Sequence, residues 1–392
     1  MPIINRIAEF RDDMQVWRRD IHRHPETAYE EFRTAKIVAE KLAEWGIEVH
    51  DGIGQTGVVG VVHGANGPGG PGIGLRADMD ALNLMELNQV DHCSSHDGKM
   101  HACGHDGHTA MLLGAARYLA ETRNFEGTAY LIFQPAEEGY GGGLAMVEDK
   151  MFERFPMDTV WGMHNWPALA AGQFAVHKRE VMAAADTFRI TVNGKGAHGA
   201  MPDQGVDPVL IGAHIIVALQ SLISRGTSPL DSAVVSATVF TGSDAFNVIP
   251  DTAFLGGTVR AFKAEVRERI EQGVIRIARS IAEAMGGSAD VNYNRGYPPT
   301  VNTEPESAFA AEIATDVAGD GNVRLDCDPS AASEDFSYML NERPGCYLWI
   351  GGGDGVTEKS LHNPHYDFND DVLTLGASYW ARLVETALPR AS

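Results

Sequence analysis

The chain has 392 residues, of which 44% are hydrophobic and 21% are charged, and its formal net charge is −22. This length exceeds the size at which a single hydrophobic core stops growing, so two domains are expected. No uninterrupted apolar run approaches the roughly 18 residues of a membrane span, and the negative charge would repel phosphate groups. The composition therefore predicts a soluble protein and argues against nucleic acid and membranes as partners.

The first 180 residues alternate helical patterns with short apolar runs. A helix is predicted to begin at a capping box, Thr27 to Glu30, and to end before Gly46, because apolar residues recur between them at mostly helical spacing. A second helical pattern covers residues 109–119. Runs typical of buried strands lie at 58–62, 73–77, 129–133 and 159–163. This alternation predicts an α/β domain with a mostly parallel sheet covered by helices.

The pattern changes at residue 184. Residues 186–192 alternate polar and apolar side chains, as a strand with one exposed face would. A helix, two strands, a helix and a strand are predicted to follow at 208–223, 233–240, 252–260, 264–285 and 289–293. The order β-α-β-β-α-β is that of a ferredoxin-like α+β domain, one sheet with two helices on a face.

The larger pattern resumes beyond residue 296, with a strand near 346–350 and a closing helix near 372–388. We therefore expect residues 184–296 to form a domain inserted into a larger one, which comprises residues 1–183 and 297–392.

Cysteine use and the N-terminal sequence bear on the compartment. Four cysteines in so long a chain do not form a disulfide framework, and a metal-binding thiol is most easily kept reduced inside the cell. The N-terminal residues lack the basic start and apolar core of a secretory signal. We therefore expect a cytoplasmic protein.

Residues 100–108 read Met-His-Ala-Cys-Gly-His-Asp-Gly-His, just ahead of a helical pattern. Thiolate and imidazole suit zinc and similar ions, and two ligands separated by one residue, such as Cys103 and His105, can face one point. A structural zinc site usually uses paired Cys-x2-Cys groups, which this chain lacks. The motif predicts a metal site that takes further ligands from elsewhere in the chain and leaves one coordination position of the metal open for the reaction. A redox thiol or an ordinary polar loop are the alternatives.

Two adjacent carboxylates follow the apolar run 129–133, in Gln-Pro-Ala-Glu-Glu-Gly at residues 134–139. Ligands of open α/β sheets bind where parallel strands end. Because adjacent side chains diverge, one of Glu137 and Glu138 can bind a metal while the other faces the substrate as a general base. The spacing does not decide which one does which, and such a pair taken alone is more often a solvated loop.

Two histidines extend the candidate ligand set. His164 ends an apolar run, and His362 lies in a loop after three glycines. Together with Cys103, His105 and Glu138 they exceed what one tetrahedral catalytic ion requires. Such a set suggests two divalent ions roughly 3.5 to 4 Å apart, with a bridging water made acidic by both. Zinc, manganese, cobalt and nickel all tolerate these ligands.

Several motifs occur together in one known group of enzymes. They lie at residues 19–26, 76–82, 100–106, 134–139 and 362–368. In these motifs the chain resembles the amidohydrolase branch of the two-metal aminoacylase and carboxypeptidase superfamily, which contains hippurate hydrolase, N-acyl-amino-acid amidohydrolases and plant hydrolases of indole-acetyl amino acids. The resemblance covers nearly the whole chain. It implies a zinc-exopeptidase-like catalytic domain with an inserted lid or dimerisation domain.

The resemblance assigns roles to the candidate residues. It implies that two metal ions are bound by Cys103, His105, Glu138, His164 and His362. It also implies that Glu137 is the general base, and thereby decides between the two glutamates.

The chain departs from its relatives at two places. More distant superfamily members have a ligand histidine where this chain has Arg76, two residues before Asp78. Asp78 is expected either to orient a metal ligand or simply to pair with Arg76. Asn83 stands where the branch usually has proline. This difference is expected to change the shape of a loop on the substrate side, and so to affect substrate specificity and not the chemistry.

The inserted domain is expected to contribute to the site as well. In resembling proteins a histidine in a glycine-flanked turn reaches across a dimer into the partner's site and helps hold the developing oxyanion, and its counterpart here is His198. By the same resemblance Asn247 and Arg260 grip a substrate carboxylate, which the planar fork of arginine binds with two parallel hydrogen bonds. The chain is therefore expected to form a homodimer or a higher homo-oligomer.

The sequence thus predicts a metal-dependent amidohydrolase that splits N-acyl amino acids, either hippurate-like or N-acetylated, into a carboxylic acid and a free amino acid. Glu137 takes a proton from water and later passes it to the departing nitrogen. The nearest alternative is a dipeptidase or carboxypeptidase on the same fold. Another is a metal-dependent binding or redox protein that uses Cys103 as a reactive thiol and hydrolyses nothing.

Overall fold

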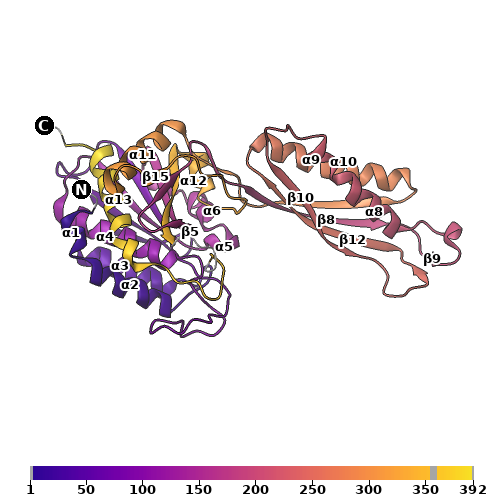
Figure 1. Cartoon of the computed structure of the whole chain (residues 1–392), viewed down its shortest axis with the longest axis horizontal. Coiled ribbons are helices and arrows are strands. Elements are labelled where there is room, and N and C mark those ends of the chain that lie inside the picture. Colours follow the sequence, from indigo (N-terminus) through magenta and orange to yellow (C-terminus); the bar gives the residue numbers. More distant parts are fainter. Residues whose placement is uncertain (1–2, 354–359, 391–392) are drawn as a thin grey trace. The chain divides into compact units, whose positions relative to one another are not determined.

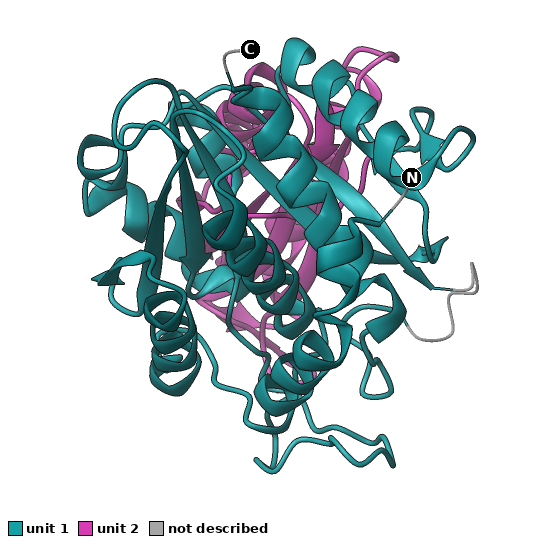
Figure 2. Cartoon of the chain, turned by 90° about the vertical axis from the view of Figure 1, so that its left-hand side faces the viewer, with its two compact units in different colours: residues 1–179, 301–328, 335–392 teal, residues 180–300, 329–334 magenta. Residues whose placement is uncertain are grey.

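The computed structural model describes residues 3–353 and 360–390, and the backbone divides into two compact units. Unit 1 contains residues 1–179, 301–328 and 335–392, and unit 2 contains residues 180–300 and 329–334 (Figure 2). None of the described helices is both long and apolar enough to cross a bilayer.

An eight-stranded sheet forms the centre of unit 1, in the order β1-β2-β4-β3-β5-β16-β6-β15. The strands are β1 (Glu48–Ile53), β2 (Gly57–His63), β3 (Gly72–Asp78), β4 (Thr128–Gln134), β5 (Thr159–Ala170), β6 (Phe174–Val176), β15 (Val323–Arg324) and β16 (Gly345–Gly353). The four neighbouring strands β4, β3, β5 and β16 are parallel, whereas β1, β2 and β6 run antiparallel to their neighbours β2, β4 and β16. The predicted α/β class is confirmed, as a mixed sheet with a parallel core.

Helices surround this sheet (Figure 1). They are α1 (Asn5–Ala8), α2 (Arg11–Arg23), α3 (Phe32–Glu44), α4 (His105–Thr122), α5 (Glu137–Tyr140), α6 (Gly142–Glu148), α7 (Met151–Arg154), α11 (Glu304–Ala318), α12 (Ser337–Glu342) and α13 (Leu373–Ala387).

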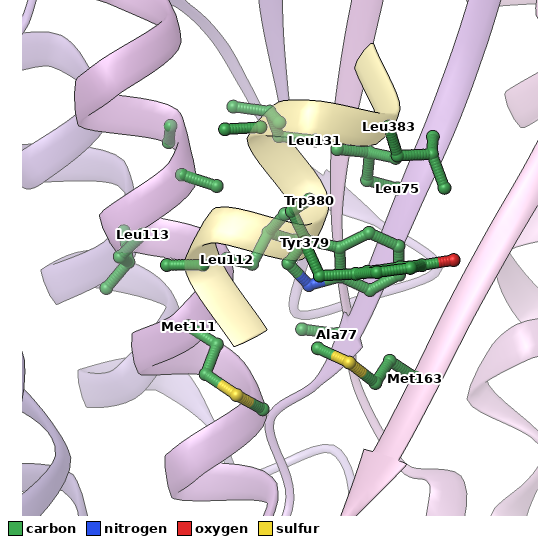
Figure 3. Packing of buried hydrophobic residues seen from close by; sticks show 14 of the residues in the cluster. Leu75, Ala77, Met111, Leu112, Leu113, Leu131, Met163, Tyr379, Trp380 and Leu383 are labelled. Carbon is green, nitrogen blue, oxygen red and sulfur yellow. The ribbon is translucent and has the colours of Figure 1, made fainter. Parts of the chain in front are cut away.

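The core of unit 1 lies between the parallel strands and the helices α4 and α13. Leu112 of α4, Trp380 and Leu383 of α13, Leu75 of β3 and Leu131 of β4 belong to one buried cluster (Figure 3). Helix α4 is buried along most of its length, because apolar residues occupy nearly every side of it. This packing fixes the N-terminal end of α4, where His105 is the first helical residue and Cys103 lies two residues before it.

The predicted start of the helix that ends before Gly46 is wrong. Helix α3 begins at Phe32 and not directly after Thr27, whose hydroxyl donates to the Glu30 side chain. The first-turn N–H groups of Arg33 and Thr34 instead donate to the carboxylate of Glu26, at 3.0 and 2.8 Å. Glu26 therefore satisfies the helix terminus that the apparent capping box was expected to satisfy.

Unit 2 contains a four-stranded antiparallel sheet in the order β10-β12-β8-β13. Its strands are β8 (Ala184–Asn193), β10 (Ala233–Thr241), β12 (Thr252–Ala261) and β13 (Ser288–Arg295). With α8 (Pro208–Leu219) between β8 and β10, and α10 (Ala264–Ala284) between β12 and β13, the element order is the predicted ferredoxin-like one.

The helices of unit 2 cover one face of its sheet, including the short α9 (Ser221–Ser224) (Figure 1). Every second residue of β8 is buried there, and Ile190 packs with Ile215 of α8 and Ile270 of α10 in a separate core. Two short strands, β9 (Ala197–His198) and β11 (Val248–Ile249), pair beside this sheet, and β7 (Glu180–Met182) pairs with β14 (Thr300–Val301).

Candidate metal centre

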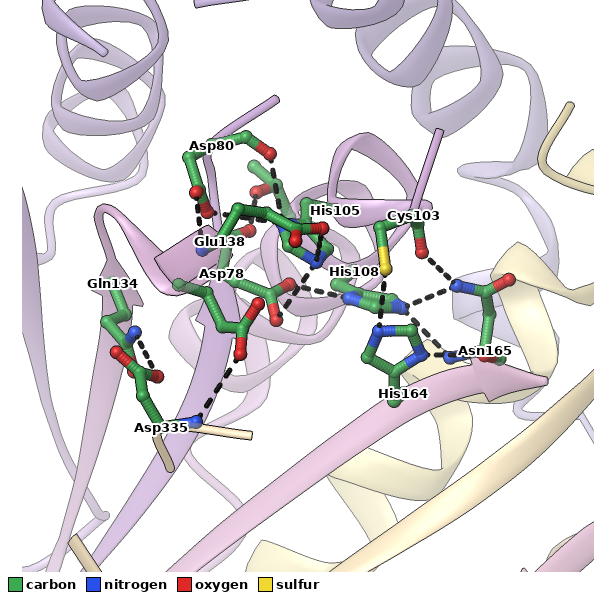
Figure 4. A network of polar contacts seen from close by, with 12 residues as sticks. Asp78, Asp80, Cys103, His105, His108, Gln134, Glu138, His164, Asn165 and Asp335 are labelled. Atoms are coloured by element: carbon green, nitrogen blue, oxygen red, sulfur yellow. Dashed lines mark hydrogen bonds and ion pairs between the residues drawn. The ribbon is translucent and has the colours of Figure 1, made fainter. Parts of the chain in front are cut away.

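Four of the predicted ligands lie where the parallel strands of unit 1 end. Cys103 and His105 stand at the start of α4, and Glu138 follows β4 in the short helix α5. His164 lies inside the longer β5, level with the ends of β3 and β4, because Gly162 of β5 pairs with Arg76 of β3. The edge of the sheet thus brings together residues that are distant in the sequence (Figure 4).

Gly104 is required between the first two ligands. Its backbone has a φ of 89°, and a Cβ atom there would lie 2.3 Å from Asn165 Nδ2 and 2.6 Å from the hydroxyl of Tyr366. Any other residue would therefore be strained and would clash. The glycine allows the chain to turn tightly into α4 between Cys103 and His105.

All five predicted ligands fall into overlapping groups whose donor atoms lie within 4.8 Å of one another. These groups are Cys103, His105 and His164; Cys103, Glu138 and His362; and His105, Glu137 and Glu138. Glu137, the predicted base, thus lies next to the same set. Thiol, imidazole and carboxylate donors gathered in this way suit one or two divalent ions such as zinc.

His105 is oriented for metal binding by Asp80. Its Nδ1 lies 2.9 Å from the carbonyl oxygen and 3.2 Å from Oδ1 of Asp80, and since both of these accept, Nδ1 must donate. In the neutral ring the lone pair is therefore on Nε2, which is buried and finds no hydrogen-bond partner among the described residues. Asp80 also accepts from the backbone N–H of Glu138, at 2.9 Å, so that one carboxylate positions two ligands.

The electrostatics at His105 favour a cation. Burial alone would lower its pKa, but the carboxylates of Asp78, Asp80 and Glu138 raise the pKa of His105 to about 10. A divalent ion would satisfy the same carboxylates and displace the proton. The donor set therefore fits a metal ion on chemical grounds.

His164 and Cys103 face each other. His164 donates from Nδ1 to the carbonyl oxygen of Asn165, at 2.6 Å, which leaves Nε2 as the lone-pair atom 3.4 Å from Cys103 Sγ. Burial and the neighbouring His108 hold the pKa of His164 well below its ordinary value, so it is neutral, as a ligand must be.

The thiol of Cys103 is not a reactive one in these surroundings. Burial and the carboxylates of Glu138 and Glu137 raise its pKa well above the ordinary value. Reactive cysteines instead lie in electropositive, partly exposed places that lower the pKa. Cys103 thus becomes a thiolate only when a cation lies beside it, which favours a metal ligand over a redox thiol.

His362 completes the group from a separate loop. Its Nε2 lies 3.1 Å from Glu138 Oε1, and its backbone N–H donates to the carbonyl oxygen of Ala102 at 2.8 Å. About half of its side chain is exposed. The loop is therefore tied to the segment that carries Cys103, and His362 forms the open side of the site.

His108, the last histidine of the 100–108 motif, has both ring nitrogens in hydrogen bonds. Nδ1 lies 2.6 Å from Asp78 Oδ1, and Nε2 accepts the backbone N–H of Asn165 at 2.9 Å. Asp78 is also 2.7 Å from Arg76 and 3.6 Å from His105 Nε2. Of the two expectations for Asp78, the pairing with Arg76 is confirmed. Its hydrogen bond to a histidine goes to His108, which is not a predicted ligand, so orientation of a metal ligand by Asp78 stays a prediction.

Glu137 is buried, and its Oε1 accepts the backbone N–H of Asp335 at 3.3 Å. The preceding residue, Ala136, has a left-handed φ of 53°, which turns the chain sharply as it leaves β4. Glu138, the next residue, departs from helical backbone angles, with a φ of −72° and a ψ of 66°. The division of roles between the two glutamates stays a prediction.

The three predicted residues of unit 2 do not all lie together. His198 pairs with Val248 between β9 and β11, and with Asn247 it lines an open hollow of about 500 Å³. Arg260 is near the opposite end of β12 from Thr252, roughly 25 Å away along the strand at the rise of an extended chain. There it donates to the side chain of Thr258 and to the carbonyl oxygen of Val259. Within unit 2, His198 and Asn247 therefore form one group and Arg260 another.

A buried network of ionic contacts connects α4 to α2 and to neighbouring loops. The carboxylate of Asp106, the residue after His105, lies 2.8 Å from Nδ1 of His22 in α2. The other ring nitrogen of His22 is 3.3 Å from Glu86, and Arg18 nearby donates to Asp367 at 2.9 Å. Burial lowers the pKa of His22, but its two carboxylate partners outweigh burial and raise the pKa to about 9.

The pKa of His22 predicts how stability depends on pH. Because the pKa is higher in the folded state than the ordinary 6.5, the protonated ring adds stability that is full below pH 6.5 and is lost as the pH rises through about 9, at most about 3 kcal/mol. The free energy of unfolding, measured with urea at pH 6.5 and at pH 9.5, should fall more for the wild type than for His22→Gln. Equal changes in the two proteins would contradict this expectation.

The residues of this site indicate a class of protein. Metal-dependent hydrolases bind their ions through buried thiol, imidazole and carboxylate groups and have a further carboxylate beside them. Residues 74–386 match the model of the peptidase family M20/M25/M40. The chain belongs to this family, and the predicted branch and enzyme class, a metal-dependent amidohydrolase, are confirmed.

Curated relatives match over nearly their whole length. The chain is 42% identical to a hippurate hydrolase of Campylobacter jejuni, over 98% of each chain. It is 38% identical to an IAA-amino acid hydrolase of Arabidopsis thaliana, over 96% of this chain and 86% of that one. A thermostable carboxypeptidase of Saccharolobus solfataricus is 37% identical over 95% of both chains.

A solved structure from Bacillus subtilis is also similar. It is described as a dinuclear metal binding peptidase from the M20 family, and it superposes with a TM-score of 0.85 and 33% identity over 97% of this chain and 99% of that one. The fold of the whole chain is therefore that of the family.

Proposed function

We propose that this protein hydrolyses the amide bond of N-acyl amino acids, such as hippurate-like or N-acetyl amino acids, and releases a carboxylic acid and a free amino acid. The observation that carries the proposal is the overlap of the donor groups with Glu137 at one edge of the sheet. The names of the relatives support it, since hippurate and indole-acetyl amino acids are both N-acyl amino acids.

The metal ligands in this proposal are Cys103, His105, Glu138, His164 and His362, which would hold two divalent ions. The dinuclear relative from Bacillus subtilis supports the number two. Zinc, manganese, cobalt and nickel all accept this mixed set of ligands. Bound there, the ions supply Lewis acidity toward the amide carbonyl and make bound water more acidic.

The other steps belong to the chain's own residues. Glu137 is the general base: it takes a proton from the attacking water and then donates it to the departing nitrogen. His198 donates a hydrogen bond to the carbonyl oxygen as negative charge develops there. Asn247 and Arg260 hold the carboxylate of the substrate, for which the guanidinium group provides two parallel donors.

A dimer is part of the proposal, because His198 and Asn247 lie at one end of β12 and Arg260 at the other. If a partner chain supplies His198 and Asn247 to a site that contains this chain's Arg260, the three residues can bind one substrate despite their separation within a chain. Exposed apolar side chains on unit 2 support self-association: Leu210 and Val217 lie on α8, and Val234 and Val239 on the edge strand β10. Residues 184–296 would then serve as the dimerisation and lid domain.

Mixing two inactive variants tests whether His198 acts across the dimer. Glu137→Gln and His198→Ala are each expected to be inactive as homodimers. If His198 serves the partner's site, a heterodimer contains one complete site, and unfolding and refolding of an equal mixture should restore about a quarter of the wild-type activity. If His198 acts within its own chain, no site is complete and nothing is recovered. Light scattering on the same samples reports whether dimers form.

The nearest alternative is a dipeptidase or carboxypeptidase, which the carboxypeptidase relative supports. Such an enzyme needs a group that receives a free α-amino group, whereas an acylase needs a surface for an uncharged acyl chain. Acetyl-, benzoyl- and aminoacyl-glycine offered together to the metal-loaded protein distinguish them. Preference for the two acylated substrates supports the proposal, and preference for the dipeptide contradicts it.

We also propose a cytoplasmic location, where the thiol of Cys103 stays reduced.

A further inference from the structure

Arg76 lies in β3, two residues before the strand ends at Asp78, and only 1% of it is exposed. Its Nε donates to Gln134 at 2.8 Å, one terminal nitrogen donates to Asp78 at 2.7 Å, and the other donates to Asp335 at 3.1 Å. Asp78 and Asp335 are themselves fully buried. A guanidinium group between two buried carboxylates is stable only because each charge is paired.

Asp335 connects this network to Glu137. Its carboxylate accepts from Arg76 and from the backbone N–H of Gly143, the latter at 2.7 Å. It also accepts from the side chain of Gln134 at 2.7 Å (Figure 4). These bonds hold the segment in place against α6, and the backbone N–H of the same Asp335 donates to Glu137 Oε1. The position of Glu137 therefore depends on how firmly Asp335 is held.

Asp78 connects Arg76 to two histidines. Asp78 bonds His108 through one oxygen, and its other oxygen, which bonds Arg76, lies 3.6 Å from His105 Nε2. Arg76 thus lies between the carboxylate that supports the histidines and the aspartate that holds Glu137. Lysine could not replace it, because a single ammonium group lacks the planar arrangement of donors that reaches three acceptors in fixed directions.

We propose that Arg76 and Asp335 are positioning residues that fix Glu137 relative to the metal ligands. The inference rests on the proposed role of Glu137 as general base. A general base works only within hydrogen-bond reach of the proton that it takes, and a displacement of about 1 Å can cost about 100-fold in rate. Both residues are buried, so in this proposal they act through Glu137 and not by binding substrate.

The test compares Asp335→Asn with the wild type. The amide of asparagine has one acceptor oxygen and a donor group, so it cannot accept from Arg76, Gln134 and Gly143 together. We expect kcat to fall by about 100-fold, KM to change by less than about threefold, and the bound metal per chain, measured by elemental analysis, to stay at the wild-type value. A kcat within about threefold of the wild type at full metal content would overturn the proposal.

A matched control separates positioning from loss of stability. Asp186 of unit 2 is also fully buried and is held by an arginine, Arg267, with bonds of 2.5 to 3.1 Å. Asp186→Asn removes the same kind of charge pair in the other compact unit, where Asp186 makes none of the bonds that hold Asp335. It should lower the melting temperature by a similar amount and leave kcat per folded molecule within about threefold of the wild type. An equal fall of kcat in both variants would mean that Asp335 is only structural.

A second variant covers the case in which Asp335→Asn does not fold. Arg76→Lys keeps the buried charge but not the three directed bonds, and should lower kcat at least tenfold at unchanged metal content. Unchanged kcat in this variant contradicts the proposal. The wild type in the same assay distinguishes the proposed function from the positioning role. Absence of turnover by the wild type contradicts the proposed function. Normal turnover by the wild type together with unimpaired variants contradicts only the positioning role.

Discussion

Replacement of Glu137 by glutamine should reduce kcat by about 10³-fold and leave the bound metal unchanged, because glutamine has nearly the same shape but takes no proton. Glu137 lies beside Glu138 in the donor group that includes His105, and its oxygen is already oriented by the backbone N–H of Asp335. The measurement is kcat per mole of metal-loaded protein, with metal content determined on the same samples.

The matched control is the neighbouring carboxylate. Glu138→Gln removes a charged donor next to His362 and His105, so this variant should lose bound metal as well as activity. The two variants thus differ in metal content and not only in rate. A Glu137→Gln protein with near-normal kcat would refute the role of Glu137 as base.

Removal of the metal should have the second large effect. Dialysis against a chelator is expected to lower activity by at least about 10³-fold, and added zinc, manganese, cobalt or nickel should restore it, since the ions both polarise the carbonyl and acidify water. The carboxylates of Asp78, Asp80 and Glu138 lie 3.2 to 4.0 Å from the ring nitrogens of His105 and raise its pKa to about 10. The metal therefore competes with a proton, and its affinity should fall as the pH is lowered.

A ligand variant provides the control for metal removal. Cys103→Ala deletes one donor from two of the three overlapping groups, so reconstitution should require a higher metal concentration than for the wild type. Activity that persists in the chelated wild type at full metal depletion would contradict the metal-dependent mechanism.

The fold could be predicted largely from periodicity. The run 129–133 became β4, which is buried throughout, and the alternating 186–192 became β8, which has one buried face. The helix before Gly46 shows where such reasoning fails. Thr27 and Glu30 have the spacing of a capping box, but Glu26 reaches the first turn of α3 in space, and sequence spacing does not reveal such a contact.

The candidate ligands could be identified from residue type and from their place after apolar runs, and the structure brings all five within overlapping groups. The choice of Glu137 as the general base and Glu138 as the metal ligand needed the resemblance to a known family. The divergence of adjacent side chains shows only that the two roles can be divided, and not which glutamate has which role. The roles of these residues stay predictions until the variants are measured.

The residues that support the site were largely missed. Asp80 orients both His105 and Glu138, and its only signal in the sequence is a second carboxylate two residues after Asp78 at a strand end. Asp335 meets Glu137 across a sequence separation of almost 200 residues and follows no strand, so no local pattern predicts the contact. Such contacts depend on tertiary packing and become visible only in the folded chain.

Product release tests most directly whether this metal centre hydrolyses N-acyl amino acids. The metal-loaded protein is incubated with N-benzoyl and N-acetyl amino acids, and the free amino acid and the carboxylic acid are both quantified. We expect equal amounts of the two products, formed only with metal and abolished by Glu137→Gln. No amino acid released from any acylated substrate by the fully metal-loaded protein would contradict this expectation.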